Sequence, residues 1–232
     1  MTTSLADSIR ATFRECCGMD ASLGERLDAF ATYIRTIDMP FAEAVDRLIV
    51  RLRKAEVGAG APQVGDVMPP FHLPDESGRV VSLDGLLGGG PVAVVVHRGH
   101  WCPYCRINTL SLAEAKPQVE AAGGQVVAIV PDRQQYAAAV HAEANGAFPV
   151  LTDMDNGYAM SLNLVFWVGS EMQELMSRAG IDLGEYQGND SWIVPVPATF
   201  VVGGDGRVRA RFVDPDYRKR MTIESMVAAL RA

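Results

Sequence analysis

Two cysteines separated by two residues, Cys102 and Cys105 in the run VVVHRGHWCPYCRINT, are the residues best suited to chemistry in this chain. The β-branched apolar run before them is typical of a buried strand, and the segment after them has the pattern of a helix. Cys102 should therefore lie where a helix begins and Cys105 one turn into it. A helix N-terminus stabilises a thiolate, and two sulfurs one turn apart can close a disulfide. The spacing predicts a redox-active dithiol.

A zinc site is the main alternative for a C-x-x-C pair. A structural zinc ion needs four ligands, and the sequence has neither a second C-x-x-C nor a histidine pair at the usual spacing. We therefore expect no bound metal and no bound cofactor. The other two cysteines, Cys16 and Cys17, are adjacent in a helical pattern and point in different directions. A packing role is expected for them, with a redox role or an intermolecular disulfide as the alternative.

The composition narrows the class of protein. The chain has 232 residues, of which 48% are hydrophobic and 21% charged, as in ordinary globular proteins. Its 21 basic and 28 acidic residues give a net charge of −7, so nucleic acid is not an expected partner. The longest apolar run, at residues 91–96, is too short to cross a membrane, and the first residues lack the pattern of a secretory signal. We expect a cytoplasmic protein that makes no membrane contact.

The hydrophobic pattern indicates the elements that position the dithiol. Residues 1–57 read as a helical N-terminal extension and residues 58–70 as a linker rich in Gly and Pro. Residues 71–232 alternate strands and helices and form the redox domain. Its expected elements are a hairpin turning at 76–78, strands over 91–97, 125–130 and 148–151, helices over 103–121 (bent near Pro117) and 132–145, two strands joined by Asp205-Gly206, and a helix over 219–231. The expected fold is α/β, with a mixed central sheet covered by helices.

Two runs of the sequence resemble a known family. They are VGDVMPPFHLPDESGRVVSLDGLLGGGPVAVVVHRGHWCPYC and NDSWIVPVPATFVVGGDGRVRARFVDPDYRKR. They resemble the two halves of the alkyl hydroperoxide reductase and thiol-specific antioxidant family, the peroxiredoxins and their relatives, and above all a peroxiredoxin-like subgroup with the motif WCPYC. The resemblance covers about residues 64–232. It implies a thioredoxin-like fold, antioxidant reduction of hydroperoxides, and thioredoxin, glutaredoxin or glutathione as the electron donor.

The chain departs from the peroxiredoxin pattern around the dithiol. In that pattern the attacking cysteine corresponds to Cys105, while a threonine and a proline correspond to Cys102 and Arg98. The arginine that activates the thiolate in the family falls at Pro197. The same replacements resemble thioredoxins and glutaredoxins. There a cis proline lies beside the dithiol, and the backbone of the preceding residue pairs with a bound peptide or glutathione; Val196 and Pro197 fit these two places.

Three functions follow from one dithiol. In a peroxidase, Cys105 attacks a hydroperoxide and Cys102 resolves the sulfenic acid as a disulfide. In a protein-disulfide or glutathione-disulfide reductase, an exposed Cys102 attacks and Cys105 resolves the mixed disulfide. In a non-enzymatic redox sensor, the dithiol controls binding of a partner to the N-terminal helices, although these could instead form a homodimer or cap the domain. The resemblance places the peroxidase first.

Residues near the dithiol should assist it. Trp101 should shield the sulfurs, and Arg98 or Arg106 could supply the positive charge that holds a thiolate and polarises a peroxide. His100 could tune the thiol as a nearby imidazolium.

An insertion over about residues 152–196 directly precedes Pro197 and should border the dithiol. Its Met, Phe and Trp content suggests a helical lid or a substrate wall. Trp192 is the candidate for a substrate-facing residue.

Overall fold

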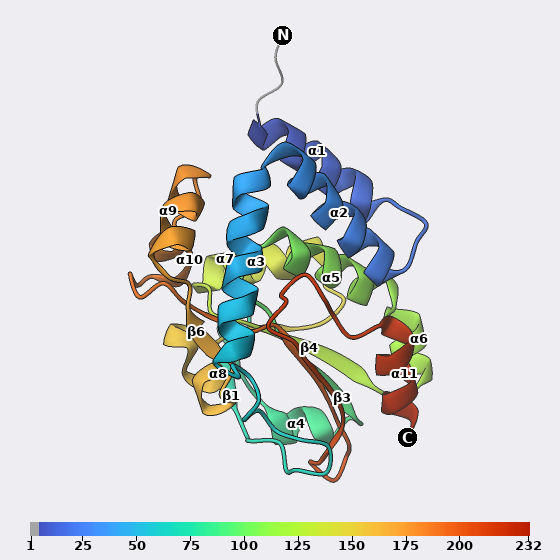
Figure 1. The fold of residues 1–232 in the computed structure, drawn as a ribbon. Helices are drawn as coiled ribbons and strands as arrows, with labels where there is room; N and C mark the ends of the chain where they lie inside the picture. Colours follow the sequence, from blue (N-terminus) through green and yellow to red (C-terminus); the bar gives the residue numbers. More distant parts are fainter. Residues whose placement is uncertain (1–4) are drawn as a thin grey trace.

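The structure is a computed structural model that describes residues 5–232, with side chains from residue 7 onward. At its centre lies a five-stranded sheet with the strand order β5-β4-β3-β8-β9 (Figure 1). Strands β3 and β4 pair in parallel, as do β4 and β5, whereas β8 pairs antiparallel with both β3 and β9. The strands are β3 (Val92–Val96), β4 (Gln125–Val130), β5 (Val150–Thr152), β8 (Ala198–Val202) and β9 (Val208–Val213). The predicted mixed sheet is confirmed.

The central strand β3 is covered on both faces. All of its residues are buried. Val94 and Val96 belong to one hydrophobic cluster, whereas Ala93 and Val95 belong to a second. Because successive side chains of a strand point to opposite faces, the two clusters occupy the two sides of the sheet. The first cluster also contains residues of the N-terminal helices and both cysteines of the C-x-x-C motif.

Three helices form the N-terminal part of the described chain: α1 (Leu5–Cys17), α2 (Leu23–Ile37) and α3 (Met39–Lys54). Ser22 begins α2 with a capping box, because its hydroxyl accepts from the Glu25 N–H while the Glu25 carboxylate accepts from the Ser22 N–H. Helices α1 and α2 pack on α5 (Pro103–Glu114), the helix that carries the dithiol. The division into an extension, a linker and a redox domain stays a prediction.

The predicted helices and strands of residues 71–232 are present with small shifts. The bent helix over residues 103–121 is two helices, α5 and α6 (Lys116–Ala121), which meet at Ala115 because Pro117 cannot continue the hydrogen bonding of α5. The last helix begins after residue 222 rather than at 219, because the Thr222 hydroxyl accepts from the Ser225 N–H and caps it. The remaining elements outside the insertion are β1 (His72–Pro74), β2 (Val80–Ser82), α4 (Leu83–Leu87), α7 (Gln134–Glu143) and α11 (Ile223–Arg231).

The insertion forms short helices and a small sheet of its own. Strands β6 and β7 pair antiparallel, and the sequence did not predict them because three residues are too few to show alternation. The elements are η1 (Met154–Asn156), α8 (Gly157–Ser161), β6 (Val165–Trp167), α9 (Ser170–Arg178), α10 (Leu183–Gln187) and β7 (Ile193–Pro195). Across the described residues, no helix combines the length and apolar character needed to cross a membrane.

Candidate active site at the Cys102–Cys105 dithiol

The dithiol lies at the start of α5, as the sequence predicted. Cys102 is the N-cap residue, Pro103 is the first helical residue, and the Cys105 N–H donates to the Cys102 carbonyl at 3.0 Å. Both cysteines are free thiols. Their side chains are nevertheless buried, with 1% of Cys102 and 2% of Cys105 exposed. The exposed Cys102 that the alternative disulfide-reductase mechanism assumed is therefore not found.

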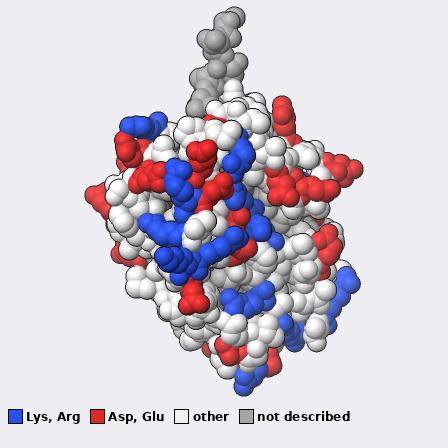
Figure 2. All heavy atoms as spheres, viewed as in Figure 1, with Lys and Arg blue, Asp and Glu red and all other residues white. Residues whose placement is uncertain are grey.

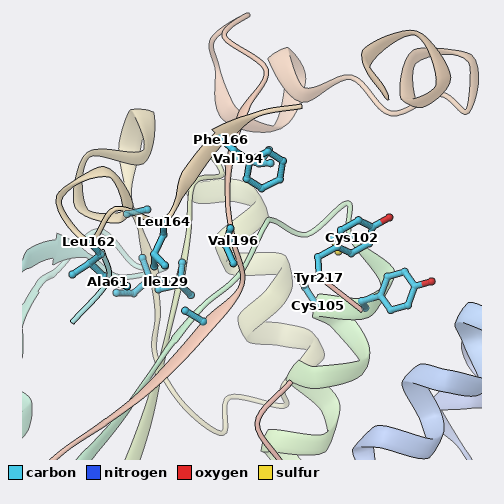
Figure 3. Packing of buried hydrophobic residues seen from close by; sticks show 14 of the residues in the cluster. Ala61, Cys102, Cys105, Ile129, Leu162, Leu164, Phe166, Val194, Val196 and Tyr217 are labelled. Atoms are coloured by element: carbon cyan, nitrogen blue, oxygen red, sulfur yellow. The ribbon is translucent and has the colours of Figure 1, made fainter. Parts of the chain in front are cut away.

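Aromatic side chains from distant parts of the chain close over the dithiol. Tyr104 lies between Phe30 of α2 and Tyr217 of the segment before α11, with ring centroids 5.2 and 5.5 Å away and edge-to-face geometry. Figure 3 shows Tyr217 beside Cys102 and Cys105. These contacts connect residues far apart in the sequence, which is why the local pattern gave no sign that Cys102 would be buried.

Arg220 is a residue at the dithiol that the sequence analysis missed. Its Nη2 donates to the Cys105 sulfur at 3.2 Å, and the Arg98 backbone N–H donates to the same sulfur at 3.4 Å. Nη1 of Arg220 donates to the carbonyls of Tyr217 and Lys219 at 2.5 and 2.6 Å, so the Arg220 guanidinium is held by the backbone of the residues just before it. The resemblance places the arginine of the family pattern at Pro197, whereas Arg220 brings a guanidinium to the dithiol from another part of the chain. The sequence marks it only as one cation in the run DYRKR.

Arg98 supplies a second buried guanidinium at the dithiol. It is one of the two arginines, Arg98 and Arg106, that the sequence offered as the source of this charge. Its guanidinium carbon lies 3.8 Å from the centroid of the Tyr217 ring and 4.6 Å from that of Trp101. Stacking on aromatic rings stabilises a cation that has little water around it. Trp101 is half-buried and its indole N–H has no hydrogen-bond partner among the described residues. The structure thus brings Arg98 and Trp101 together at the dithiol.

The two thiols differ in acidity because of these neighbours. Burial opposes ionisation of Cys102, but hydrogen bonding with Cys105 and the positive charges of Arg98 and Arg220 outweigh it and lower the pKa of Cys102 to about 6. Burial and the adjacent Cys102 raise the pKa of Cys105 well above its usual value. These directions favour a thiolate at Cys102 and a proton at Cys105, whereas the two N–H groups that donate to a sulfur, from Arg220 and the Arg98 backbone, both contact Cys105.

Two further buried groups lie near the dithiol. Burial lowers the pKa of His97 to about 4, and Nδ2 of Asn108 lies 3.0 Å from its Nε2, so the imidazole is neutral. Burial raises the pKa of Asp132 to about 7, although its carboxylate accepts from the His100 N–H. Asp132 lies two residues after the end of β4. It was also missed, because an aspartate after a strand has no distinctive spacing relative to the cysteines.

Arg106 and His100 are directed away from the sulfurs. Both contact Glu143 of α7: Nε of Arg106 donates to Oε2 at 2.9 Å, and Nε2 of His100 lies 3.3 Å from Oε1. The Arg106 guanidinium also lies 4.5 Å from the centroid of the Phe13 ring of α1. Arg106 thus ties α5 to α7 and α1, and His100 ties the segment before α5 to α7. Arg98 and Arg220 provide the charge at the dithiol.

The residues expected to act as in thioredoxins and glutaredoxins are arranged differently. No peptide bond among the described residues is cis, so the cis bond expected before Pro197 is wrong. The Val196 N–H donates to the Leu164 carbonyl at 2.6 Å, so it is not free to pair with a bound peptide. Leu164, in the insertion just before β6, occupies that hydrogen-bonding position, which explains why the Val196 N–H is not free.

The insertion shares a hydrophobic cluster with the dithiol. Leu164, Phe166 and Val194 appear in this cluster with Cys102 and Cys105 (Figure 3). Trp192 is buried in the same cluster, and its carbonyl accepts from the Val168 N–H. Its contact with a substrate stays a prediction.

The N-terminal cysteines have the properties of packing residues. Cys16 is buried in the main cluster, and burial raises its pKa. Burial raises the pKa of Cys17 to about 11, so its thiol is protonated and unreactive at neutral pH. Within residues 5–232, no three His, Cys, Asp or Glu side chains form a group that could hold a metal ion.

Comparisons with known proteins agree with this architecture. A sequence profile described as the AhpC/TSA family matches residues 64–211. Among the curated proteins, none matches the chain. The structure is similar to peroxidoxin BcpB from Mycobacterium tuberculosis, with 20% identity, a TM-score of 0.57, and coverage of 73% of this chain and 97% of that one. It is also similar to peroxiredoxin Q from Xanthomonas campestris, with 16% identity, a TM-score of 0.53, and coverage of 69% and 89%.

A third similar structure is peroxiredoxin 6 from Arenicola marina, with 15% identity, a TM-score of 0.52, and 68% of each chain covered. These structures share the fold of this chain and confirm the thioredoxin-like fold that the sequence resemblance implied. The family profile spans more than half of the 232 residues, including both cysteines and Arg98. The chain belongs to the AhpC/TSA family.

Proposed function

We propose that this chain is a thiol-dependent peroxidase, an antioxidant enzyme of the cytoplasm that reduces hydroperoxides through Cys102 and Cys105. The observation that carries the proposal is the pair of buried guanidinium groups, Arg98 and Arg220, set against a dithiol at a helix N-terminus. Membership of the AhpC/TSA family supports it, as does the likeness to structures named as a peroxidoxin and a peroxiredoxin.

In the first step, the Cys102 thiolate attacks the terminal oxygen of the hydroperoxide. A sulfur–oxygen bond forms, the oxygen–oxygen bond breaks, and the leaving alkoxide takes a proton from the medium, which gives a sulfenic acid at Cys102 and an alcohol. Arg98 and Arg220 stabilise the negative charge as it moves from sulfur to the leaving oxygen. The lowered pKa of Cys102 keeps the attacking form populated at neutral pH.

In the second step, Cys105 resolves the sulfenic acid. Its sulfur bonds to the Cys102 sulfur while the hydroxyl group and the Cys105 proton leave as water, so a disulfide remains. An external thiol of the thioredoxin, glutaredoxin or glutathione class then reduces this disulfide. The order is the reverse of the one that the peroxiredoxin pattern assigns, because the charges of Arg98 and Arg220 favour the thiolate at Cys102.

Disulfide exchange with proteins fits this geometry less well. Cys102 is buried, so a disulfide in a folded protein would need a far larger opening than a small hydroperoxide. The Val196 N–H is already occupied by Leu164. Both observations favour a small substrate.

The test is stopped-flow oxidation of the reduced protein by hydrogen peroxide and by tert-butyl hydroperoxide. Cys105→Ser keeps a hydroxyl that can donate to the Cys102 thiolate, so we expect it to retain the wild-type rate constant within about threefold and to stop at a sulfenic acid. Cys102→Ser should react more slowly by at least about tenfold, because the thiol with the raised pKa alone remains.

Three other outcomes would change the proposed mechanism or refute the proposed activity. A fast Cys102→Ser and a slow Cys105→Ser would reverse the order of attack and leave the peroxidase intact. A wild-type protein that reacts with peroxide no faster than free cysteine thiolate would refute the peroxidase. Rapid reduction of insulin or of a glutathione mixed disulfide by that same protein would then point to disulfide exchange.

A further inference from the structure

The segment between β9 and α11, residues 214–222, has no helix or strand, yet it carries both Tyr217 and Arg220 to the dithiol. A side chain on an irregular segment has many conformations, and fixing one of them costs free energy. The contact of Arg220 with Cys105 therefore depends on whatever holds this segment in place.

Arg218 holds the segment from within. It binds Asp216 through two parallel hydrogen bonds, from Nε to Oδ1 at 2.8 Å and from Nη2 to Oδ2 at 3.0 Å. The Asp216 N–H in turn donates to Oδ1 of Asp214 at 2.8 Å. The bidentate geometry fixes the direction of the Arg218 side chain and leaves its Nη1 free for a third partner.

That third partner lies on the N-terminal helices. Nη1 of Arg218 donates to Oδ1 of Asp46 in α3 at 3.0 Å, and the other Asp46 oxygen accepts from Arg35 of α2. The charges of both arginines lower the pKa of Asp46, which keeps it ionised. Arg53, also of α3, pairs with Asp214 at 3.4 Å. Figure 2 shows basic and acidic side chains interleaved over α3 and α9.

The link from Asp46 to the dithiol is continuous. Arg218 lies between Tyr217 and Lys219, whose carbonyls accept the two hydrogen bonds from Nη1 of Arg220. A displacement of residues 217–219 would therefore move the guanidinium that contacts Cys105. It would also move Tyr217, on which the Arg98 guanidinium stacks.

We propose that Asp46 is a positioning residue for the thiol chemistry, and that through Arg218 it makes the N-terminal helices a working part of the active site. This inference rests on the proposed function. Asp46 touches neither sulfur; it acts by holding the segment that places Arg220 and Tyr217. The helical extension thereby has a role within a single chain that needs no partner molecule.

The test compares Asp46→Asn with a matched control, Glu171→Gln. The control removes the ion pair between Arg47 of α3 and Glu171 of α9, a surface pair that is more exposed than the Asp46–Arg218 pair and does not touch residues 214–222. For Asp46→Asn we expect a fall in the second-order rate constant with hydrogen peroxide of about two- to fivefold, the range of one weakened ion pair. The pH profile of Cys102 alkylation by iodoacetamide should move to higher pH. Glu171→Gln should change neither quantity.

A second measurement separates positioning from general loss of stability. If Asp46 acts through Arg220, Asp46→Asn should have little further effect on the alkylation profile of Arg220→Lys. The inference would be overturned if Asp46→Asn left the pH profile of Cys102 alkylation unchanged. It would also be overturned if Asp46→Asn shifted that profile equally in the wild type and in Arg220→Lys. Because alkylation needs no peroxide, the result stands even where the wild type proves not to be a peroxidase.

Discussion

Replacing Arg220 by methionine should raise the pKa of Cys102 and slow its oxidation. Arg220 is buried, donates to the Cys105 sulfur at 3.2 Å, and is one of the two charges that lower the pKa of Cys102 to about 6. Arg220 acts on Cys102 through its positive charge; a nearby opposite charge shifts a pKa by about one to three units, and one unit corresponds to about 1.4 kcal/mol. Loss of the guanidinium should therefore raise the Cys102 pKa by about one to two units.

This shift sets the size of the kinetic effect. At pH 7 the thiolate fraction of Cys102 should fall from about nine-tenths to between about a half and a tenth. The guanidinium also stabilises the leaving oxygen, so the total loss at pH 7 should reach about ten- to a hundredfold. Raising the pH above the new pKa restores the thiolate but not the charge near the leaving oxygen. A deficit should therefore persist at high pH.

The assay is stopped-flow oxidation by hydrogen peroxide over a range of pH, together with the alkylation profile of Cys102. Arg106→Met is the control, because Arg106 pairs with Glu143 and not with the sulfurs. An alkylation profile equal to that of the wild type would refute the electrostatic role of Arg220. Complete recovery of the rate at high pH would refute its action on the leaving oxygen.

Two predictions concern stability. The pKa of Cys102 is lowered from 9.0 to about 6. Its ionisation therefore stabilises the folded dithiol form of the protein by up to about 4 kcal/mol above pH 9, and this stabilisation is lost as the pH falls towards 6. Urea unfolding should show the advantage of the wild type over Cys102→Ser growing between these pH values; a constant difference would contradict the lowered pKa. For Asp132 the pKa is raised from 3.8 to about 7, so ionisation should destabilise the wild type relative to Asp132→Asn by up to about 4 kcal/mol as the pH rises from 4 to 7. Parallel stability curves for these two proteins would show that Asp132 does not titrate in this range.

The sequence predicted the parts of the fold and site that depend on local pattern. The buried strand before the cysteines, the helix that starts at Pro103 and the Asp205-Gly206 hairpin each follow from residues that are neighbours in the chain. Arg98 and Trp101 were within reach of the same reasoning, since they lie only a few residues from Cys102.

The features that the sequence did not predict depend on contacts between distant residues. Arg220 reaches Cys105 across 115 positions of the chain, and no spacing rule relates the two. The burial of Cys102 depends on Phe30, Tyr104 and Tyr217, which come from three separate parts of the sequence. The occupied Val196 N–H depends on the position of β6, a strand too short to show a pattern.

The arrangement of charge explains how the chain can depart from the family pattern and still suit peroxide chemistry. Within the described residues, neither Arg98 nor Arg220 has a carboxylate partner, and a buried cation without an anion is costly. The Cys102 thiolate offsets part of that cost, so the two arginines and the thiolate stabilise one another. During cleavage of an oxygen–oxygen bond the negative charge is spread over the sulfur and the departing oxygen, and two separate cations can stabilise both ends at once. The proline in place of the family arginine is therefore compatible with this reaction, provided that residues 214–222 are held in place, and this requirement gives the N-terminal helices their role.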